Sequence, residues 1–181
     1  MRPFLLEAPV GPLLQLDDLK KHIRVEGDGE NTLVEAYERA AVALLDGYSG
    51  ILGRCVLKQK WALPLMGCPD AVFLPFPDCR DFQIEQRLSS GDWIDVENVA
   101  IQQDGDCVSF VDLPCGEAGL HLTCWAGWET ADEVKETLKQ AVRMLTAHWF
   151  DNRSAVTTGQ APHNVPLGFQ GMIAPLVHVF V

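Results

Sequence analysis

The chain has 181 residues, of which 48% are hydrophobic and 22% are charged, so it is long enough for one well-buried domain and does not have the composition of a disordered protein. Its formal net charge of -11 and its scattered Lys and Arg residues argue against a basic face that grips nucleic acid, although an acidic wall past which DNA slides stays compatible. No signal peptide is recognisable, and no stretch approaches the roughly 20 apolar residues that cross a bilayer. We therefore expect an intracellular product without a membrane partner.

The cysteines give no sign of a metal site, because none forms a C-x-x-C pair and their spacings match no zinc-binding pattern. Their even number would permit three disulfides, but a chain of this size does not need such cross-links. We expect reduced, mostly buried thiols and no metal or cofactor. The six cysteines are Cys55, Cys68, Cys79, Cys107, Cys115 and Cys124.

Two helices are predicted in the first third of the chain, a short one over residues 13–24 and a long one over residues 31–53. Thr32 and Glu35 have the form of a capping box for the long helix, although residues just before them could cap it instead. The apolar residues of the long helix recur with the period of one buried face. They are Leu33, Tyr37, Ala40, Ala41, Leu44, Leu45 and Tyr48.

The hydrophobic period changes to two after the long helix, which predicts a small antiparallel sheet of four to six strands. Asp104-Gly105 between two alternating runs is a strong hairpin signal, because glycine tolerates the positive φ of a tight turn. The predicted strands are residues 56–63, 81–88, 93–96, 99–102, 107–111 and 119–126.

A second long helix is predicted from Thr130, which forms a capping box with Glu133, to about residue 152. The predicted fold class is α+β: a helical hairpin or bundle of two long helices with short helices, and an inserted small antiparallel β-sheet. Residues 1–152 would form this helical domain, with the β-rich insertion at about 55–128. The residues expected to pack the two long helices together are Leu33, Tyr37, Leu44, Val134, Leu138, Val142, Leu145 and Trp149.

The C-terminal residues 153–181 contain a single formal charge, that of Arg153, and finish in an apolar run. Exposed apolar surface of that size must pack on its own domain or enter another protein. We therefore predict that this segment is a docking tail with a short helix at about 166–174. The candidate docking residues are Val165, Pro166, Leu167, Phe169, Met172, Ile173, Leu176, Val177 and Phe180.

Known catalytic patterns are absent: there is no serine hydrolase elbow, P-loop, H-E-x-x-H helix or redox C-x-x-C. His121, Asp78, Asp81 and Glu85 could serve acid–base chemistry, but acidic residues on the solvent face of a strand are common, and His148 is expected to pack or cap its helix. The five tryptophans lack the interleaved Lys and Arg of a single-strand nucleic-acid groove, so we expect them to anchor the core or an interface. These tryptophans are Trp61, Trp93, Trp125, Trp128 and Trp149.

Residues 128–153 resemble a known family, most distinctively in the run His148-Trp149-Phe150-Asp151-Asn152-Arg153. The opening over residues 16–23 and the tail motif Val165-Pro166-Leu167-Gly168 also match. The chain is similar to the head–tail connector proteins (adaptor or head-completion proteins) of long-tailed bacteriophages, including the adaptor of gene transfer agents.

This resemblance implies a structural virion protein and not an enzyme. Family members form a ring, commonly of twelve subunits, beneath the portal; the ring extends the DNA channel and provides the platform for the tail. The implied partners are the portal protein, a tail or stopper/terminator protein, other copies of the chain, and passing DNA without sequence-specific binding. The implied location is the head–tail junction of a virion or phage-like particle, after assembly in the bacterial cytoplasm.

The resemblance also assigns roles to segments: the two long helices would form the ring body and residues 165–181 would dock on the portal. Deleting those residues is expected to leave a folded domain that no longer joins the portal. The alternatives are another virion joining protein, such as a tail terminator or stopper, a small enzyme using Asp81, Glu85 or His121, or a plain intracellular scaffold domain.

Overall fold

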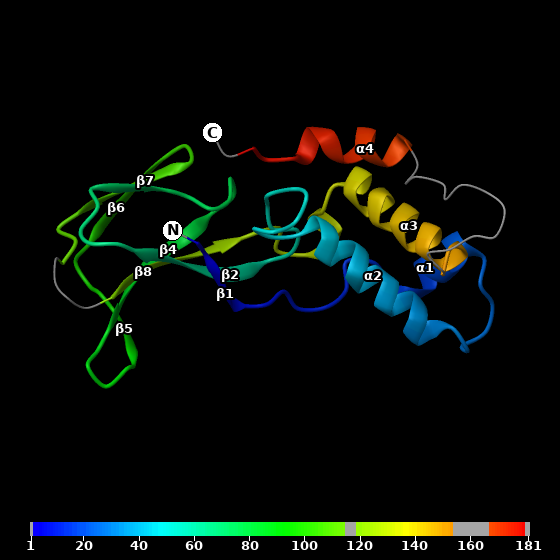
Figure 1. Ribbon diagram of the computed structural model, residues 1–181, viewed down its shortest axis with the longest axis horizontal. Helices are drawn as coiled ribbons and strands as arrows, with labels where there is room; N and C mark the ends of the chain where they lie inside the picture. The colour runs from blue at the N-terminus through cyan, green and yellow to red at the C-terminus, as the bar shows by residue number, and fades with distance from the viewer. Residues whose placement is uncertain (1, 115–118, 154–166, 180–181) are drawn as a thin grey trace. The chain divides into compact units, whose positions relative to one another are not determined.

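A computed structural model of the chain describes residues 2–114, 119–153 and 167–179. The chain divides into two compact units, each built from two separate stretches of sequence. The sheet unit comprises Met1–Val10 and Leu57–Gly127, and the helical unit comprises Gly11–Val56 and Trp128–Val181 (Figure 1). The α+β class predicted from the sequence is confirmed. None of the helices in the described ranges is long and apolar enough to cross a membrane.

The sheet unit contains two antiparallel sheets, whereas the sequence predicted one. The larger sheet has five strands in the order β1-β2-β8-β4-β5, and the smaller has three in the order β3-β7-β6. The strands are β1 (Phe4–Glu7), β2 (Gln59–Leu65), β3 (Ala71–Phe73), β4 (Arg80–Arg87), β5 (Trp93–Asp95), β6 (Ala100–Asp104), β7 (Cys107–Val111) and β8 (Leu120–Ala126).

Strand alternation gives the larger sheet one buried face. Leu63, Leu122 and Ile84 stand opposite one another on β2, β8 and β4, and each is at most 6% exposed. Pro64 interrupts the apolar run of β2 without breaking the sheet. Because β1 pairs with β2 only as far as Ala62, Pro64 has a strand partner on one side alone, and such an edge position is where a sheet tolerates proline.

Two strands, β1 and β3, are missing from the sequence-based prediction. Each has at most four residues, and β1 alternates neither in polarity nor in burial, since all four of its side chains are exposed. Its place is decided by pairing with β2, where Phe4 lies opposite Ala62. The predicted hairpin at Asp104-Gly105 is present between β6 and β7, and Gly105 has the expected positive φ of 59°.

The helical unit is built around its two longest helices, α2 and α3, which pack against each other, with α1 against both and α4 along α3 (Figure 1). The core of this unit includes Leu19 of α1, Leu45 of α2 and Leu138 of α3. The helical segments are α1 (Leu16–Ile23), α2 (Asn31–Leu45), η1 (Ala131–Glu133), α3 (Glu136–Asp151), α4 (Leu167–Ile173) and η2 (Ala174–Leu176).

Helix α2 ends eight residues before the predicted end at residue 53. Asp46 leaves the helix in an extended conformation, and its carboxylate accepts a hydrogen bond from the Val56 N–H at 2.6 Å. Gly47 follows with a φ of 74°. The chain turns here because a side-chain acceptor and a left-handed glycine replace the next helical turn.

Neither predicted capping box forms. The Thr130 hydroxyl donates a hydrogen bond to the Glu133 carboxylate at 3.2 Å instead of accepting one from a backbone N–H. The residues that follow Thr130 form a single 3-10 turn before α3 begins. At α2, the cap position is Glu30, which makes no side-chain cap bond.

The cysteines depart from the expectation of reduced thiols at one position, Cys68, which is disulfide-bonded. Cys55, Cys79 and Cys124 are buried as expected, and Cys107 is half-buried. Cys115 lies outside the described residues.

Candidate docking surfaces

The C-terminal segment, residues 167–179, is folded onto its own unit over much of its length. Phe169, Ile173 and Leu176 are only 5–6% exposed. Gly168 lies against α3, since a Cβ atom added to it would be 3.8 Å from the Met144 side chain. Three of the candidate docking residues therefore belong to the core of the helical unit.

Other side chains of the same segment face solvent. Val179 is 69% exposed, and Met172 and Val177 are half-buried. The His178 N–H donates to the Leu52 carbonyl at 2.8 Å, which holds the end of the segment in place while Val179 points outward. Leu167 begins α4, and Val165, Pro166 and Phe180 lie outside the described residues. Of the candidate docking residues with described side chains, Met172 and Val177 are thus partly accessible, and Val179, which the sequence did not single out, is exposed beside them.

The residues predicted to pack the long helices are divided between the core and the surface. On α3 and just before it, Val134, Leu138, Val142 and Leu145 are all at most 3% exposed. Tyr37 of α2 and Trp149 of α3 are half-buried, with ring centroids 6.5 Å apart.

The buried face of α2 is rotated by one residue from the predicted face. Val34, Glu38, Ala41 and Leu45 are buried, whereas Leu44 is 41% exposed. The apolar pattern did not identify this face, because one of its four buried positions is the carboxylate Glu38. The sequence analysis did not single out Glu38. Its spacing, four residues after Val34 and seven before Leu45, could have indicated that it lies on the buried face of the helix.

Glu38 is buried because it supplies an acceptor to the segment that precedes α1. Its Oε1 atom accepts hydrogen bonds from the Leu13 N–H at 2.9 Å and the Leu14 N–H at 3.3 Å. Burial raises the pKa of Glu38, although the two backbone N–H groups act in the opposite direction. The contact fixes Leu13 and Leu14 on α2, where both of their side chains are buried.

The distinctive motif over residues 148–153 closes the end of α3. The backbone N–H and the side-chain amide of Asn152 both donate to the His148 carbonyl, at 3.0 and 2.8 Å. Arg153 donates to the Phe150 carbonyl, lies over the Phe150 ring at 4.4 Å, and pairs with Glu30 at the start of α2 at 3.3 Å. The motif therefore caps one long helix and ties it to the other, so these residues have a structural use that requires no reaction.

Exposed apolar side chains also occur on α2 and in the loop that follows it. Leu44 is 41% and Ile51 is 44% exposed. The backbone N–H of Ile51 donates to the Leu44 carbonyl at 3.0 Å, so the two residues lie side by side and form one patch. The C-terminal segment ends close to this patch, because His178 donates to the carbonyl of Leu52, the residue after Ile51.

The larger sheet carries an aromatic cluster on its less buried face. The imidazole of His121 stacks on Trp93 with centroids 3.7 Å apart and meets the edge of Phe4 at 5.0 Å. Phe4 and Trp93 are 39% and 38% exposed. Burial, and secondarily the charge of Arg87, lower the pKa of His121, so this ring is a neutral packing element at neutral pH.

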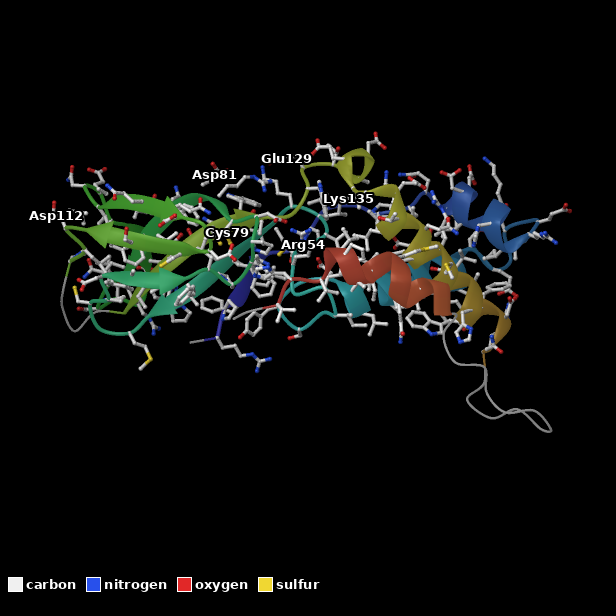
Figure 2. The ribbon with its side chains drawn as sticks, turned by 90° about the horizontal axis from the view of Figure 1, so that it is seen from above. Arg54, Cys79, Asp81, Asp112, Glu129 and Lys135 are labelled. Carbon is white, nitrogen blue, oxygen red and sulfur yellow. The ribbon has the colours of Figure 1, made fainter. Side chains whose placement is uncertain are left out.

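The structure brings together two of the residues proposed for acid–base chemistry, because Glu85 on β4 stands opposite His121 on β8, but both side chains have other partners. Glu85 forms an ion pair with Lys60 at 3.5 Å, whereas Asp81 is exposed at an irregularity of β4 (Figure 2). His121 is occupied by its two aromatic neighbours. Within the described ranges, no three metal-ligating side chains come together.

Four tryptophans are half-buried, and two of these lie beside cations. Lys58 lies 4.9 Å from the centre of the Trp125 ring and Arg54 lies 5.5 Å from that of Trp128. Trp61 packs edge-on against Phe76 at 5.0 Å. The sequence did not reveal these cation contacts, because neither Lys58 nor Arg54 adjoins its ring along the chain.

Charge is unevenly distributed along the sequence. From Leu88 to Val134 there is no Lys or Arg, while acidic residues recur throughout. Asp112, after β7, is one of the exposed acids of this stretch (Figure 2). A surface of this kind repels a DNA backbone.

The fold is similar to those of chains in gene transfer agent particles. One chain from the "Neck of empty GTA particle computed with C6 symmetry" aligns with a TM-score of 0.76 and 18% identity over 100% of this chain and 97% of that chain. A chain from the "Virion of native gene transfer agent (GTA) particle" aligns with a TM-score of 0.76 and 19% identity over the same shares. A chain from the "Neck of native GTA particle computed with C12 symmetry" gives 0.70 and 18% over 98% and 97%.

Comparison by sequence found no matching protein-family model and no matching curated protein. At 18–19% identity the structural similarity establishes a shared fold. It extends over nearly the whole of both chains, so it involves the sheet unit as well as the helical unit.

Proposed function

We propose that this chain is a structural subunit of the head–tail neck of a gene transfer agent or related phage-like particle, where copies of it form a ring beneath the portal. The full-length similarity to chains of gene transfer agent necks carries this proposal. The symmetries of those necks, C6 and C12, favour a ring of six or twelve copies. As the ring's subunit, the chain would extend the DNA channel and provide the platform for the tail.

The distribution of side chains supports a structural role. The most distinctive sequence motif caps α3 and ties it to α2 through Arg153 and Glu30. The histidine that a small enzyme would need, His121, stacks on Trp93 and meets Phe4 edge-on. In such a subunit the two long helices serve as a rigid body, and stability, not reactivity, is what their buried residues supply.

A ring subunit needs lateral and axial contact surfaces, and the helical unit offers two apolar candidates. The patch of Leu44 and Ile51 suits a lateral contact with a neighbouring copy. The exposed side of the C-terminal segment, with Met172, Val177 and Val179, suits an axial contact with the portal. The buried residues of that segment position it and do not dock.

The acidic balance of the chain supports a place beside DNA that moves. A wall with a net negative charge does not retain a polyanion, so DNA passes without sequence-specific binding. The stretch from Leu88 to Val134, which has no basic residue, suits such a wall.

A single charged substitution on the C-terminal segment tests the docking role. Deleting the whole segment would remove Phe169, Ile173 and Leu176 from the core, so loss of binding by that variant would be uninformative. Val179→Asp places a charge on a side chain that is 69% exposed, and Met66→Asp places the same charge on one that is 74% exposed in the sheet unit. Both variants should unfold at the same denaturant concentration as the unaltered chain.

Binding to isolated portal rings then separates the outcomes. We expect Val179→Asp to weaken portal binding at least tenfold, about 1.4 kcal/mol, and Met66→Asp to leave it unchanged. Binding to isolated tails but not to portals would instead identify a tail terminator or stopper. Particles in which electron microscopy locates this chain anywhere other than the neck would overturn the proposed function itself.

A further inference from the structure

Two cysteines of the sheet unit have their sulfur atoms in contact. Cys79 immediately precedes β4, and Cys124 lies on β8, the strand with which β4 pairs. Their Sγ atoms are 3.1 Å apart, and the side chains are 4% and 2% exposed. A disulfide requires an S–S distance of about 2.05 Å, so roughly 1 Å of side-chain movement separates this thiol pair from a covalent bond.

We propose that Cys79 and Cys124 form a disulfide that fastens the start of β4 to β8 when the chain folds in contact with an oxidising disulfide. The position of the pair in the sheet gives such a bond a structural use. Between Arg80 and Gln83 the pairing of β4 with β8 shifts register, and Asp81 adopts a positive φ of 54°. The ladder of backbone hydrogen bonds is therefore interrupted just beyond Cys79, where a covalent link would replace the missing restraint.

The sheet unit already contains an oxidised cysteine. Cys68, between β2 and β3, is disulfide-bonded, so this unit accommodates disulfide chemistry. Figure 2 shows the Cys79 side chain among the strands of the sheet unit. The two links would restrain different parts of the unit, the β2–β3 connection and the beginning of β4.

The bond would form by two thiol–disulfide exchanges with oxidised glutathione or a disulfide of the same class. The thiolate of one cysteine attacks a glutathione sulfur, which forms a mixed disulfide and releases one glutathione thiolate. The other cysteine loses its proton, attacks the protein sulfur of the mixed disulfide and releases the second glutathione. Two protein thiols are thereby oxidised to one disulfide, and one oxidised glutathione is reduced to two thiols.

Burial determines when this reaction can occur. Glutathione cannot reach either sulfur while β4 and β8 are paired, because both side chains are almost fully covered. Oxidation should therefore be fast while the chain folds and slow once it has folded, limited by local opening of the start of β4. The inference concerns the sheet unit alone and does not depend on the proposed function.

The test is to refold the reduced full chain in a buffer of reduced and oxidised glutathione, block remaining thiols by alkylation, and identify linked peptides by mass spectrometry. We expect a peptide pair joined through Cys79 and Cys124, lighter by two hydrogen atoms than the separate peptides, in most molecules. Cys107, which is half-buried on β7, should be alkylated. Recovery of Cys79 and Cys124 as alkylated thiols, or of Cys79 joined to another cysteine, would overturn the inference.

Thermal unfolding of variants gives an independent measurement. The unaltered chain should melt several degrees higher after oxidative refolding than after refolding with reductant. Cys79→Ala and Cys124→Ala should each lose the same part of this difference, and the matched control Cys107→Ala should keep all of it. The disulfide at Cys68 also forms only in the oxidised samples, so it adds the same increment to the unaltered chain and to each variant and accounts for the part of the difference that the variants keep. A redox-dependent difference in Cys79→Ala equal to that of the unaltered chain would contradict the proposed bond.

Discussion

Replacement of Glu38 by alanine should destabilise the helical unit more than any surface substitution. Its Oε1 atom accepts two backbone hydrogen bonds, from Leu13 at 2.9 Å and Leu14 at 3.3 Å, and the side chain is 3% exposed. In Glu38→Ala both N–H groups lose their acceptor inside the protein. Each such loss costs about 1–3 kcal/mol, and relief of the buried carboxylate offsets part of it, so we expect about 2–4 kcal/mol in the free energy of unfolding.

Replacement of Glu38 by glutamine keeps an oxygen acceptor and should cost about 1 kcal/mol or less at neutral pH. The difference between the Ala and Gln variants therefore isolates the acceptor from the charge. Glu35→Gln, an exposed carboxylate on the same helix, serves as the control and should change stability by less than about 0.5 kcal/mol.

The pH dependence of the Gln variant follows from the direction of the pKa shift. Burial raises the pKa of Glu38 in the folded state above its value in the unfolded chain. The folded protein then holds this proton more tightly, so the contribution of Glu38 is fully present below the unfolded pKa and is lost as the pH rises through the folded pKa. Relative to the unaltered chain, Glu38→Gln should gain stability as the pH rises from mildly acidic to neutral.

Urea denaturation of the three variants across this pH range, followed by circular dichroism, measures both effects. The reasoning is refuted if Glu38→Gln is as unstable as Glu38→Ala at every pH, because the oxygen acceptor would then be irrelevant. It is also refuted if the free energy of unfolding of Glu38→Gln falls relative to that of the unaltered chain as the pH rises.

Three further substitutions test other parts of the structure. Gly127→Ala should cost at least about 2 kcal/mol in urea denaturation, because a Cβ there would lie 2.4 Å from a backbone oxygen at a φ of 95°, whereas Gly29→Ala, with open space around it, should be near neutral. A double-mutant cycle on Arg153 and Glu30, measured by urea denaturation, should yield a coupling free energy of about 0.5 kcal/mol that falls with added salt, because both side chains are more than a third exposed. A coupling free energy above about 2 kcal/mol would show that this pair is not a surface ion pair. Thr123→Val should be neutral or stabilising by thermal melting, since the buried hydroxyl makes no hydrogen bond to any described group, and a loss of more than about 1 kcal/mol would reveal a partner for it.

The elements predicted well from the sequence are those whose signal is local. The stripe Leu138, Val142 and Leu145 repeats within a few residues and identified α3, and the alternation of β4 and the Asp104-Gly105 turn are equally short-range. The resemblance based on residues 128–153 also anticipated the fold that the comparisons support.

Within the apolar C-terminal segment, the tertiary structure decides which side chains are buried, and composition does not. Phe169 and Val179 are equally apolar in the sequence, yet one lies in the core and the other is 69% exposed. Their difference depends on whether α3 is present beneath them. A pattern of residue types contains no information on that distance, so the sequence predicted an apolar segment without showing which of its side chains are available.

By itself, the sequence determined the approximate positions of α2, α3 and every strand except β1 and β3, because backbone periodicity repeats over a few residues and needs no distant partner. Tertiary structure alone decided that Phe4 begins a strand on β2, that Glu38 and not Leu44 faces the core, and that Cys79 touches Cys124. In each case the deciding contact joins residues far apart in the chain. Its free energy depends on the burial and hydrogen bonding that exist only after those distant segments have come together.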